Sequence, residues 1–314
     1  MTAARLQRPR YSACESATLP EPGPTQLRVH LEGCGVCASS LPLWQWRDWF
    51  SYPLEAGAPG HEGWGVVDAV GDDVTKFSPG DRVAVLSQHA FAEYDVADEA
   101  ATVRLPRELD ATAFPGEALG CAMNVFRRSA IKPKQTVAII GAGFIGALLV
   151  QLAAGTGANV LAVSRRRFAQ DVASQCGAAQ ACGFDEAEAM IGQTAPGGCP
   201  VVIEATGQQA ALDLAGTIIG EGGRMVIAGY HQDGLRQINM QQWNWRGIDV
   251  INAHERDLTV QVRGMQEAVQ AVIDGRLDPS PLLTHRFPLD QVDAAFELIE
   301  QRPDGFVKAL VVNS

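Results

Sequence analysis

The stretch from Thr136 to Gly155 constrains the fold more than any other part of the sequence. It begins with the apolar run 137–140, continues as Gly141-Ala-Gly143-Phe-Ile-Gly146 and ends in a second apolar segment. These glycines suit a strand-to-helix turn that binds a pyrophosphate. They allow a tight turn, close approach of the backbone to the phosphates and close packing of helix on strand. We therefore predict a dinucleotide site at the turn residues Gly141, Gly143, Phe144, Ile145 and Gly146.

The residues after the next expected strand bear on the choice of dinucleotide. An acidic side chain at the end of that strand would bind the adenosine ribose of NAD. Here the sequence reads Ser164-Arg165-Arg166-Arg167, without a carboxylate. Guanidinium groups can instead hold a 2′-phosphate through charge-assisted hydrogen bonds, although a solvated helix start is the plainer alternative. We expect NADP(H), bound in part by Ser164, Arg165 and Arg166.

Length, charge and cysteine content exclude several classes of protein. A chain of 314 residues suggests about two domains. The net charge of −11 argues against a nucleic-acid surface, and no apolar run approaches the ~20 residues that cross a bilayer. Residues 1–10 have no apolar signal core, so we expect a cytoplasmic protein with no membrane partner. The odd number of cysteines, seven, favours reduced thiols over disulfides.

The pattern of the chain changes near residue 121. Short apolar runs separated by glycine and proline, for example 26–31, 65–70 and 82–86, predict a β-rich unit. Beyond it, strands expected at 136–140, 160–163, 201–204, 225–228 and 249–252 alternate with helical segments, which predicts a parallel sheet covered on both faces. A helix over 259–274 and a final strand over 307–312 return to the first unit. We expect one domain of 1–120 and 256–314 and a second of 121–255.

Three side chains in the first unit could hold a metal ion. Cys37 and His61, with a carboxylate from Glu62 or Glu117, would provide three ligands and leave a fourth position open, as catalytic zinc requires. Alternatively, Cys34-x-x-Cys37 could be half of a structural zinc knuckle, but no second such pair completes it.

Several motifs together resemble one family. They are the Gly-x-Cys segment at Cys37, the Gly-His-Glu at His61, the turn 79–83, the dinucleotide fingerprint and the ending 284–289. Over nearly its whole length the chain resembles the medium-chain dehydrogenase/reductases, in particular their zinc-dependent alcohol and polyol dehydrogenases. The resemblance implies a doubly wound Rossmann domain, a GroES-like catalytic domain and self-association as a homodimer or homotetramer.

The same resemblance implies roles for individual residues. Cys37 and His61 match zinc ligands, and Glu117 matches the glutamate that polyol and threonine dehydrogenases use where other members have cysteine. Glu62 is a further candidate ligand, because members of the family exchange the two carboxylates. Ser39 matches the residue that hydrogen-bonds the substrate oxygen and passes its proton toward the cofactor ribose.

Three departures from the family pattern affect these expectations. The four-cysteine lobe for a structural zinc is missing after Val85, so we expect one catalytic zinc ion and no structural zinc. Ser40 stands where many members have an aspartate that orients the ligand histidine, which could weaken the metal site. Pro42 replaces a histidine that some members use to deliver protons to solvent.

Other residues allow two interpretations. The aromatic side chains between Cys37 and His61 either pack the loop or, beginning with Trp44, wall a substrate pocket. His231 and His254 each follow an expected strand of the parallel sheet, where open α/β sheets bind ligands, so either could touch cofactor or substrate.

The sequence thus predicts an enzyme that exchanges hydride between NADP(H) and a small-molecule alcohol, which the resemblance suggests is a secondary, polyol or cyclic one. Two alternatives stay open. One is a zinc-free NADPH-dependent reductase of an enone or quinone, and the other is a non-catalytic NADPH-binding protein.

Overall fold

A computed structural model describes residues 1–313 of the chain, which divide into two compact units. Of the described residues, the first comprises 1–120, 257–273 and 280–313, and the second comprises 121–256 and 274–279. Arg256 and residues 274–279 therefore belong to the second unit, whereas the sequence analysis assigned them to the first. Helix α2 (Gly116–Ser129) begins in the first unit and continues in the second.

The first unit is rich in β-structure. A hairpin of β1 (Thr2–Arg8) and β2 (Tyr11–Ser16) precedes a seven-stranded sheet in the described residues. The order of that sheet is β14 (His285–Pro288), β15 (Ala309–Val312), β3 (Gln26–Gly35), β4 (Glu62–Val70), β5 (Arg82–Val85) and β7 (Thr102–Arg104), with β6 (Tyr94–Asp98) paired to β3. Its helices are α1 (Leu41–Gln45), α8 (Leu258–Ile273) and α9 (Val292–Gln301). The last strand, β15, pairs with β3, so the end of the chain closes the sheet formed by its beginning.

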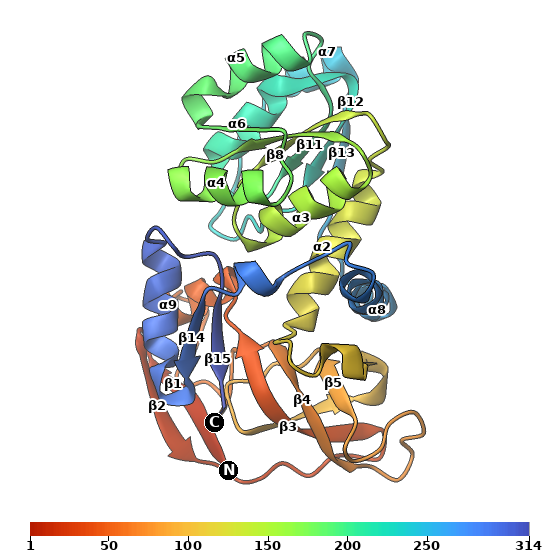
Figure 1. Ribbon diagram of the computed structural model, residues 1–314. Coiled ribbons are helices and arrows are strands. Elements are labelled where there is room, and N and C mark those ends of the chain that lie inside the picture. Colours follow the sequence, from red (N-terminus) through yellow and green to blue (C-terminus); the bar gives the residue numbers. More distant parts are fainter. Residues whose placement is uncertain (314) are drawn as a thin grey trace. The chain divides into compact units, whose positions relative to one another are not determined.

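The second unit contains a parallel sheet of six strands among the described residues (Figure 1). Its order is β10 (Gln180–Cys182), β9 (Asn159–Val163), β8 (Thr136–Ile140), β11 (Cys199–Glu204), β12 (Ile219–Ile227) and β13 (Asp249–Asn252). The helices are α3 (Phe144–Gly155), α4 (Arg167–Gln175), α5 (Phe184–Thr194), α6 (Gln209–Ile218) and α7 (Met240–Arg246). The five parallel strands expected from the sequence are present, while the short strand β10 was not predicted.

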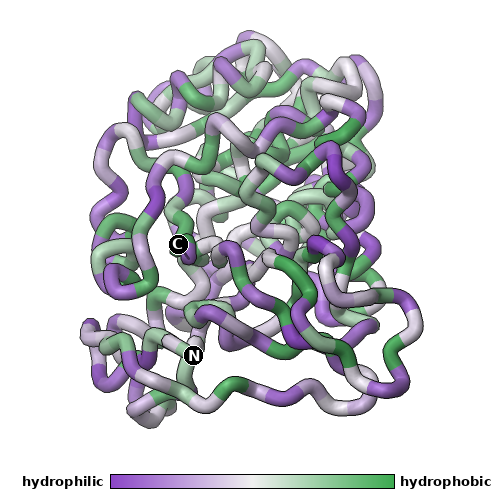
Figure 2. The backbone as a smooth tube through the Cα atoms, turned by 60° about the horizontal axis from the view of Figure 1, so that its bottom comes forward, coloured by the Kyte–Doolittle hydropathy of each residue, from purple (hydrophilic) through white to green (hydrophobic). Residues whose placement is uncertain are grey.

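Alternate strand residues face the two sides of this sheet. Val137 and Ile139 pack in one core with α3 and α4, and Ala138 and Ile140 pack in another with α5 and α6. Figure 1 shows the two helix pairs on opposite sides of the strands, and Figure 2 shows hydrophilic stretches mainly on outer turns and helices. Burial on both faces explains why the strands read as continuous apolar runs. The predicted fold, a Rossmann sheet plus a separate β-rich domain, is confirmed.

Small differences from the expected bounds occur at the end of the chain. The helix predicted over 259–274 is α8, Leu258–Ile273, and the strand predicted over 307–312 is shorter, Ala309–Val312. Gly275 follows the helix with a φ of 68°, the left-handed conformation that commonly ends helices. Within residues 1–313, none of the helices combines the length and apolar composition needed to cross a membrane.

Candidate active site

The register of two neighbouring strands brings three potential metal ligands together. In the antiparallel pair β3–β4, Gly35 lies opposite Glu62, so Cys37 just after β3 meets His61 just before β4. One ligand atom from each of Cys37, His61 and Glu62 lies within 4.8 Å of the other two. Residues 24 positions apart in the sequence are thereby gathered at one edge of the first unit's sheet.

Glu62 is the buried member of this cluster. Its side chain has no exposed surface, and its Oε1 accepts a hydrogen bond of 2.6 Å from the Lys308 ammonium, which is itself buried. Its Oε2 has no hydrogen-bond partner among residues 1–313. A Cβ atom at Gly35 would lie 1.8 Å from that oxygen, so only glycine at this position leaves room for the carboxylate. A buried carboxylate oxygen without a partner is suited to bind a cation.

Lys308 was not identified from the sequence, although a signal was present. It is the one charged residue in the otherwise apolar run Phe306–Val312, which is unusual for a buried strand. Burial lowers its pKa, but Glu62, Cys37 and Glu117 outweigh that effect and raise it above the ordinary lysine value. Lys308 therefore remains charged and offsets the acidic groups around it.

His61 is held by backbone as well as by side chains. Its Nδ1–H donates to the Pro59 carbonyl over 3.0 Å, and the Ser40 hydroxyl lies 3.4 Å from the same nitrogen. In the neutral imidazole Nε2 is therefore the nitrogen that carries the lone pair and can bind a metal ion. The Pro59 carbonyl thus performs the orienting role that the absent aspartate would have had, and Ser40 contributes only a long contact.

The anionic neighbours of His61 control its protonation. Burial lowers the pKa of the imidazole, yet the hydrogen bond and charge of Cys37, with the charges of Glu117 and Glu62, raise it to about 10. A site that binds a proton this tightly on an imidazole has a strongly negative environment, which also favours a divalent cation. A metal ion bound to Nε2 would displace that proton.

The two other predicted residues of this site lie close to the cluster. The Ser39 hydroxyl donates to the Cys37 sulfur over 3.1 Å. Glu117, in the first turn of α2, raises the pKa of both His61 and Lys308 but lies outside the group of three whose atoms are mutually within 4.8 Å. Of the two carboxylates left open by the sequence, Glu62 is the one in the cluster.

Cys34 has a different environment from Cys37. It is fully buried in β3, where it pairs with Gly63 and Val311, and burial raises the pKa of its thiol well above the ordinary value. Such a thiol is a poor metal ligand. The geometry therefore does not favour the alternative in which Cys34 and Cys37 form a zinc knuckle.

Trp44 requires a correction. Its side chain has no exposed surface and stacks on Phe296 at a centroid distance of 5.6 Å. The Arg10 guanidinium lies over the Trp44 ring, 4.6 Å from its centroid, and the Trp44 Nε1–H donates to Asp293. The prediction that Trp44 walls a substrate pocket was wrong, because its ring is part of the core of the first unit. Of the aromatic side chains in this segment, Trp46 and Trp49 are the exposed ones, at 53% and 70%.

The glycine turn of the second unit has the geometry that a pyrophosphate site requires. Gly141 has a φ of 101°, which favours glycine, and a Cβ at Gly146 would lie 1.8 Å from the Gly141 carbonyl oxygen. A Cβ at Gly143 would meet nothing within 4 Å, so the space beside this backbone is open. Phe144 begins α3, and the N-terminus of that helix is directed at the same space.

The arginines after β9 differ in their pairing. Arg167 forms an i,i+4 ion pair with Asp171 at 3.2 Å, whereas Arg165 is exposed and has no ionic or hydrogen-bond partner among residues 1–313. Arg166 is the N-cap residue of α4, and Ser164 is buried with its carbonyl accepting from Gln170. Arg165 is therefore the guanidinium best placed to accept a new anionic partner.

The two histidines at the end of the parallel sheet lie in different surroundings. His231 follows β12 and its Nε2 lies 2.9 Å from the Glu204 carboxylate. His254 follows β13 and stacks on Tyr230 at 5.6 Å. Contact of either residue with cofactor or substrate stays a prediction.

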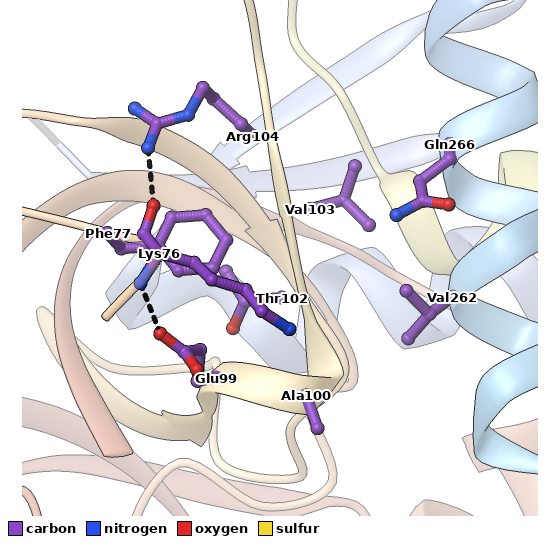
Figure 3. Close-up of a pocket in the computed structure, with 9 residues that line it drawn as sticks. All are labelled: Lys76, Phe77, Glu99, Ala100, Thr102, Val103, Arg104, Val262 and Gln266. Carbon is purple, nitrogen blue, oxygen red and sulfur yellow. Dashed lines mark hydrogen bonds between the residues drawn. The ribbon is translucent and has the colours of Figure 1, made fainter. Parts of the chain in front are cut away.

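A separate cavity in the first unit contains none of the predicted site residues. It has a volume of about 250 Å³ and lies between the β7 region and α8 (Figure 3). Its polar groups are largely engaged with each other, since Arg104 donates to the Lys76 carbonyl and the Lys76 amide donates to Glu99. We assign it no part in catalysis.

Comparison with known proteins agrees with this arrangement. Residues 23–107 match the family model described as alcohol dehydrogenase GroES-like domain, and residues 145–274 match that of zinc-binding dehydrogenase. The chain is similar to the L-threonine 3-dehydrogenase of Anaeromyxobacter sp., with 25% identity over 93% of both chains. It is also similar to human sorbitol dehydrogenase, with 24% identity over 91% of this chain and 89% of the relative.

Solved structures show the same fold along the whole chain. One from Sinorhizobium meliloti, described as a zinc-binding dehydrogenase bound to NADP, has 26% identity and a TM-score of 0.85, covering 99% of this chain and 98% of its own. A cobalt- and zinc-bound thermostable alcohol dehydrogenase from Pyrobaculum aerophilum has 26% identity and a TM-score of 0.86, covering 99% of both chains.

Proposed function

Because the chain belongs to the zinc-type alcohol dehydrogenase-like members of the medium-chain dehydrogenase/reductase family, we propose that it is a zinc-dependent oxidoreductase of NADP(H) and a secondary alcohol or its ketone. The observation that carries this proposal is the cluster of Cys37, His61 and Glu62, in which a soft thiolate, an imidazole and a partnerless carboxylate oxygen converge within 4.8 Å. This donor set matches that of catalytic zinc sites.

The residues of the cluster would hold and orient the metal. Zinc bound there would supply Lewis-acid chemistry, lowering the pKa of an alcohol oxygen so that hydride can leave the carbon for the nicotinamide ring. The Pro59 carbonyl fixes the ring of His61, and Lys308 holds Glu62 in place. Glu117 adds negative charge to the site and is the second candidate ligand.

Ser39 is the proposed proton carrier of the reaction. Its hydroxyl donates to the Cys37 sulfur and therefore lies next to a proposed metal ligand. A hydroxyl both donates and accepts, so it can receive a proton from the alcohol and pass one onward. Pro42 has no titratable group, which leaves water or the cofactor ribose as the exit for that proton.

Two other functions are less well supported. A zinc-free reductase of activated double bonds would have no use for the Cys37–His61–Glu62 cluster, and metal analysis of the purified protein separates it from our proposal. A non-catalytic NADPH-binding protein would bind the dinucleotide without alcohol-dependent turnover. The donor set of the cluster favours an enzyme over both.

The substrate is best sought directly. A panel of secondary, polyol and cyclic alcohols with NADP+, read by NADPH fluorescence, should identify at least one that produces NADPH in a zinc-loaded sample. Reduction of the matching ketone should consume NADPH. Absence of turnover on every member, with zinc and NADP+ both bound, would contradict the proposed activity.

Replacement of Arg165 tests the choice of cofactor. In the Arg165→Ala variant we expect the KM for NADP+ to rise about tenfold or more, because charge-assisted hydrogen bonds to the 2′-phosphate are lost. The KM for NAD+ should stay nearly unchanged. Arg167→Ala is the matched control, since Arg167 is already paired with Asp171. An equal effect of Arg165→Ala on both cofactors would contradict the phosphate assignment.

We also propose that the chain forms a homodimer or homotetramer, as the family resemblance implies. Several large apolar side chains of the second unit are exposed, among them Met240, Trp245 at 86% and Val250 on the edge strand β13. Exposed apolar side chains beside an unpaired strand edge are typical of an interface. Analytical ultracentrifugation tests this, and a monomer at micromolar concentration would contradict it.

A further inference from the structure

A buried polar network joins two loops of the second unit that the proposed chemistry does not use. The loops follow β11 and β12, and their centre is Glu204, whose side chain has no exposed surface. Its Oε1 accepts from the Thr206 amide at 2.6 Å, the Thr206 hydroxyl at 2.5 Å and the Gly207 amide at 2.9 Å. The whole loop after β11 is thus organised by one carboxylate.

His231 extends this network into the second loop. The Arg236 Nε–H donates to His231 Nδ1 over 2.8 Å, so Nδ1 is the unprotonated nitrogen and Nε2–H donates to Glu204 Oε2 over 2.9 Å. Both ring nitrogens are therefore engaged by protein groups, so neither is available to exchange a proton with a substrate. It acts on its neighbours rather than on reacting atoms.

Arg236 closes the network back onto the first loop. Its Nη2 donates to the Gly207 carbonyl over 2.8 Å and is also paired with Asp233. The side chains of Glu204, His231 and Arg236 are hydrogen-bonded in series. Together they link residues 205–208 to residues 229–236.

The two loops also touch through their backbones. A Cβ at Gly229 would lie 2.1 Å from the Gly207 amide nitrogen and 2.6 Å from Glu204 Oε2. Gly207 itself has a φ of 73° and packs against the Tyr230 backbone. A displacement of one loop would therefore displace the other, because their backbones are in direct contact.

The position of these loops indicates what they serve. The strand order β10-β9-β8-β11-β12-β13 reverses between β8 and β11, and dinucleotides bind across such a reversal at the carboxyl ends of the strands. The glycine turn proposed to bind the pyrophosphate follows β8, and the arginines proposed to bind the 2′-phosphate follow β9. The other half of the dinucleotide, the nicotinamide riboside, must then extend over the ends of β11 and β12.

We propose that Glu204, His231 and Arg236 form a positioning clamp that fixes the surface on which the nicotinamide half of the cofactor rests. The clamp rests on the proposed function, since it presumes a bound dinucleotide. Hydride transfer requires the reacting carbons to be held within about 3–3.5 Å of each other, so rigid loops at this place raise the rate as well as the affinity. None of the three is a catalytic residue.

Binding of a cofactor fragment tests the clamp. NADP+ and 2′-phospho-ADP, which ends at the second phosphate and so lacks the nicotinamide riboside, are titrated calorimetrically into the intact protein. In Arg236→Ala and His231→Ala we expect the Kd for NADP+ to rise about fivefold to tenfold, and kcat with the alcohol found in the panel to fall by up to about 10²-fold. The Kd for the fragment should change less than about twofold.

Arg246→Ala is the matched control. Arg246 also donates to backbone carbonyls of the second unit, those of Gly216, Thr217 and Ile219, but at the opposite end of β12. Its loss should lower the melting temperature without a selective effect on NADP+. His231→Gln, whose amide offers both an acceptor and a donor, should restore most of the affinity. Arg236→Lys provides a second variant if an alanine variant fails to fold, and should show the same selective loss, because lysine cannot bridge both contacts.

The outcomes separate the clamp from the function on which it rests. Equal weakening of NADP+ and fragment, or a pattern shared with Arg246→Ala, would mean that the network is merely structural and would overturn the clamp alone. Failure of the wild-type protein to bind the fragment or NADP+ would overturn the dinucleotide site and the clamp together.

Discussion

The Cys37→Ser variant should lose its bound zinc and its activity together. A serine hydroxyl remains protonated where a thiolate binds zinc, so one of three ligands disappears from the cluster. The Lewis acid contributes several kcal/mol to transition-state stabilisation, which corresponds to a fall in kcat/KM of about 10³-fold or more. Zinc content by mass spectrometry and turnover of the alcohol found in the panel measure the two losses. Binding of NADPH should persist, because the glycine turn belongs to the second unit.

The neighbouring cysteine is the natural control for this experiment. Cys34 is three residues away and buried in β3, and its thiol, with a raised pKa, donates to the Gly35 carbonyl. Cys34→Ala should keep zinc and activity while costing some stability. If Cys34→Ala released the zinc as Cys37→Ser does, the knuckle alternative would hold instead. Full turnover of metal-free wild-type protein would defeat the zinc mechanism altogether.

The second unit could be predicted from the sequence almost completely, and the reason is local. Its strands are buried on both faces and separated by helices with clear apolar spacing, so composition and periodicity identify them without knowledge of contacts. The glycine pattern is likewise local, because Gly141 has a φ of 101° and a Cβ at Gly146 would lie 1.8 Å from the Gly141 carbonyl oxygen. The short strand β10 was missed because Gln180, Ala181 and Cys182 carry no strand-like pattern, and only pairing with β9 makes them a strand.

The first unit shows where such reasoning fails. Cys37 and His61 were identified by motif, but their meeting depends on the register in which Gly35 faces Glu62, which no local pattern reveals. The Pro59 carbonyl orients His61 although a backbone atom has no signature in a sequence. Trp44 was misjudged because its partners Phe296 and Asp293 lie some 250 residues away in the chain.

The network of Glu204, His231 and Arg236 illustrates an intermediate case. The place of His231 after a strand of the parallel sheet predicts that it lies near a ligand, and this stays a prediction. Its engagement by both Glu204 and Arg236 could not be predicted, since it depends on how two loops approach each other. Position along a sheet is readable from a sequence, whereas the assignment of a donor or acceptor role requires coordinates.

The largest effect on stability is expected from Lys308→Met. Glu62 has no exposed surface, and its Oε1 is hydrogen-bonded to Lys308, so the variant would leave a buried carboxylate without the ammonium group that pairs with it. Removal of one partner of a buried ion pair costs about 3–5 kcal/mol. The loss of stability is measured by amide hydrogen exchange in β3, β4 and β15. If the free energy of opening falls by about 3 kcal/mol, these amides should exchange about 10²-fold faster. Lys76→Met, which removes the same charge from an exposed side chain, should change stability by less than about 0.5 kcal/mol.

The double variant Glu62→Gln/Lys308→Met distinguishes charge from shape. A neutral amide in place of the carboxylate removes the unpaired charge, so the double variant should recover most of the stability that Lys308→Met loses. Saturating zinc should also reduce the cost of Lys308→Met, because a divalent cation beside Glu62 replaces the missing positive charge. If zinc restores the stability of Lys308→Met but does not stabilise the double variant, the buried ion pair and the metal site share the charge of Glu62. If neither zinc nor the double substitution recovers stability, the cost of Lys308→Met comes from packing and not from the charge of Glu62.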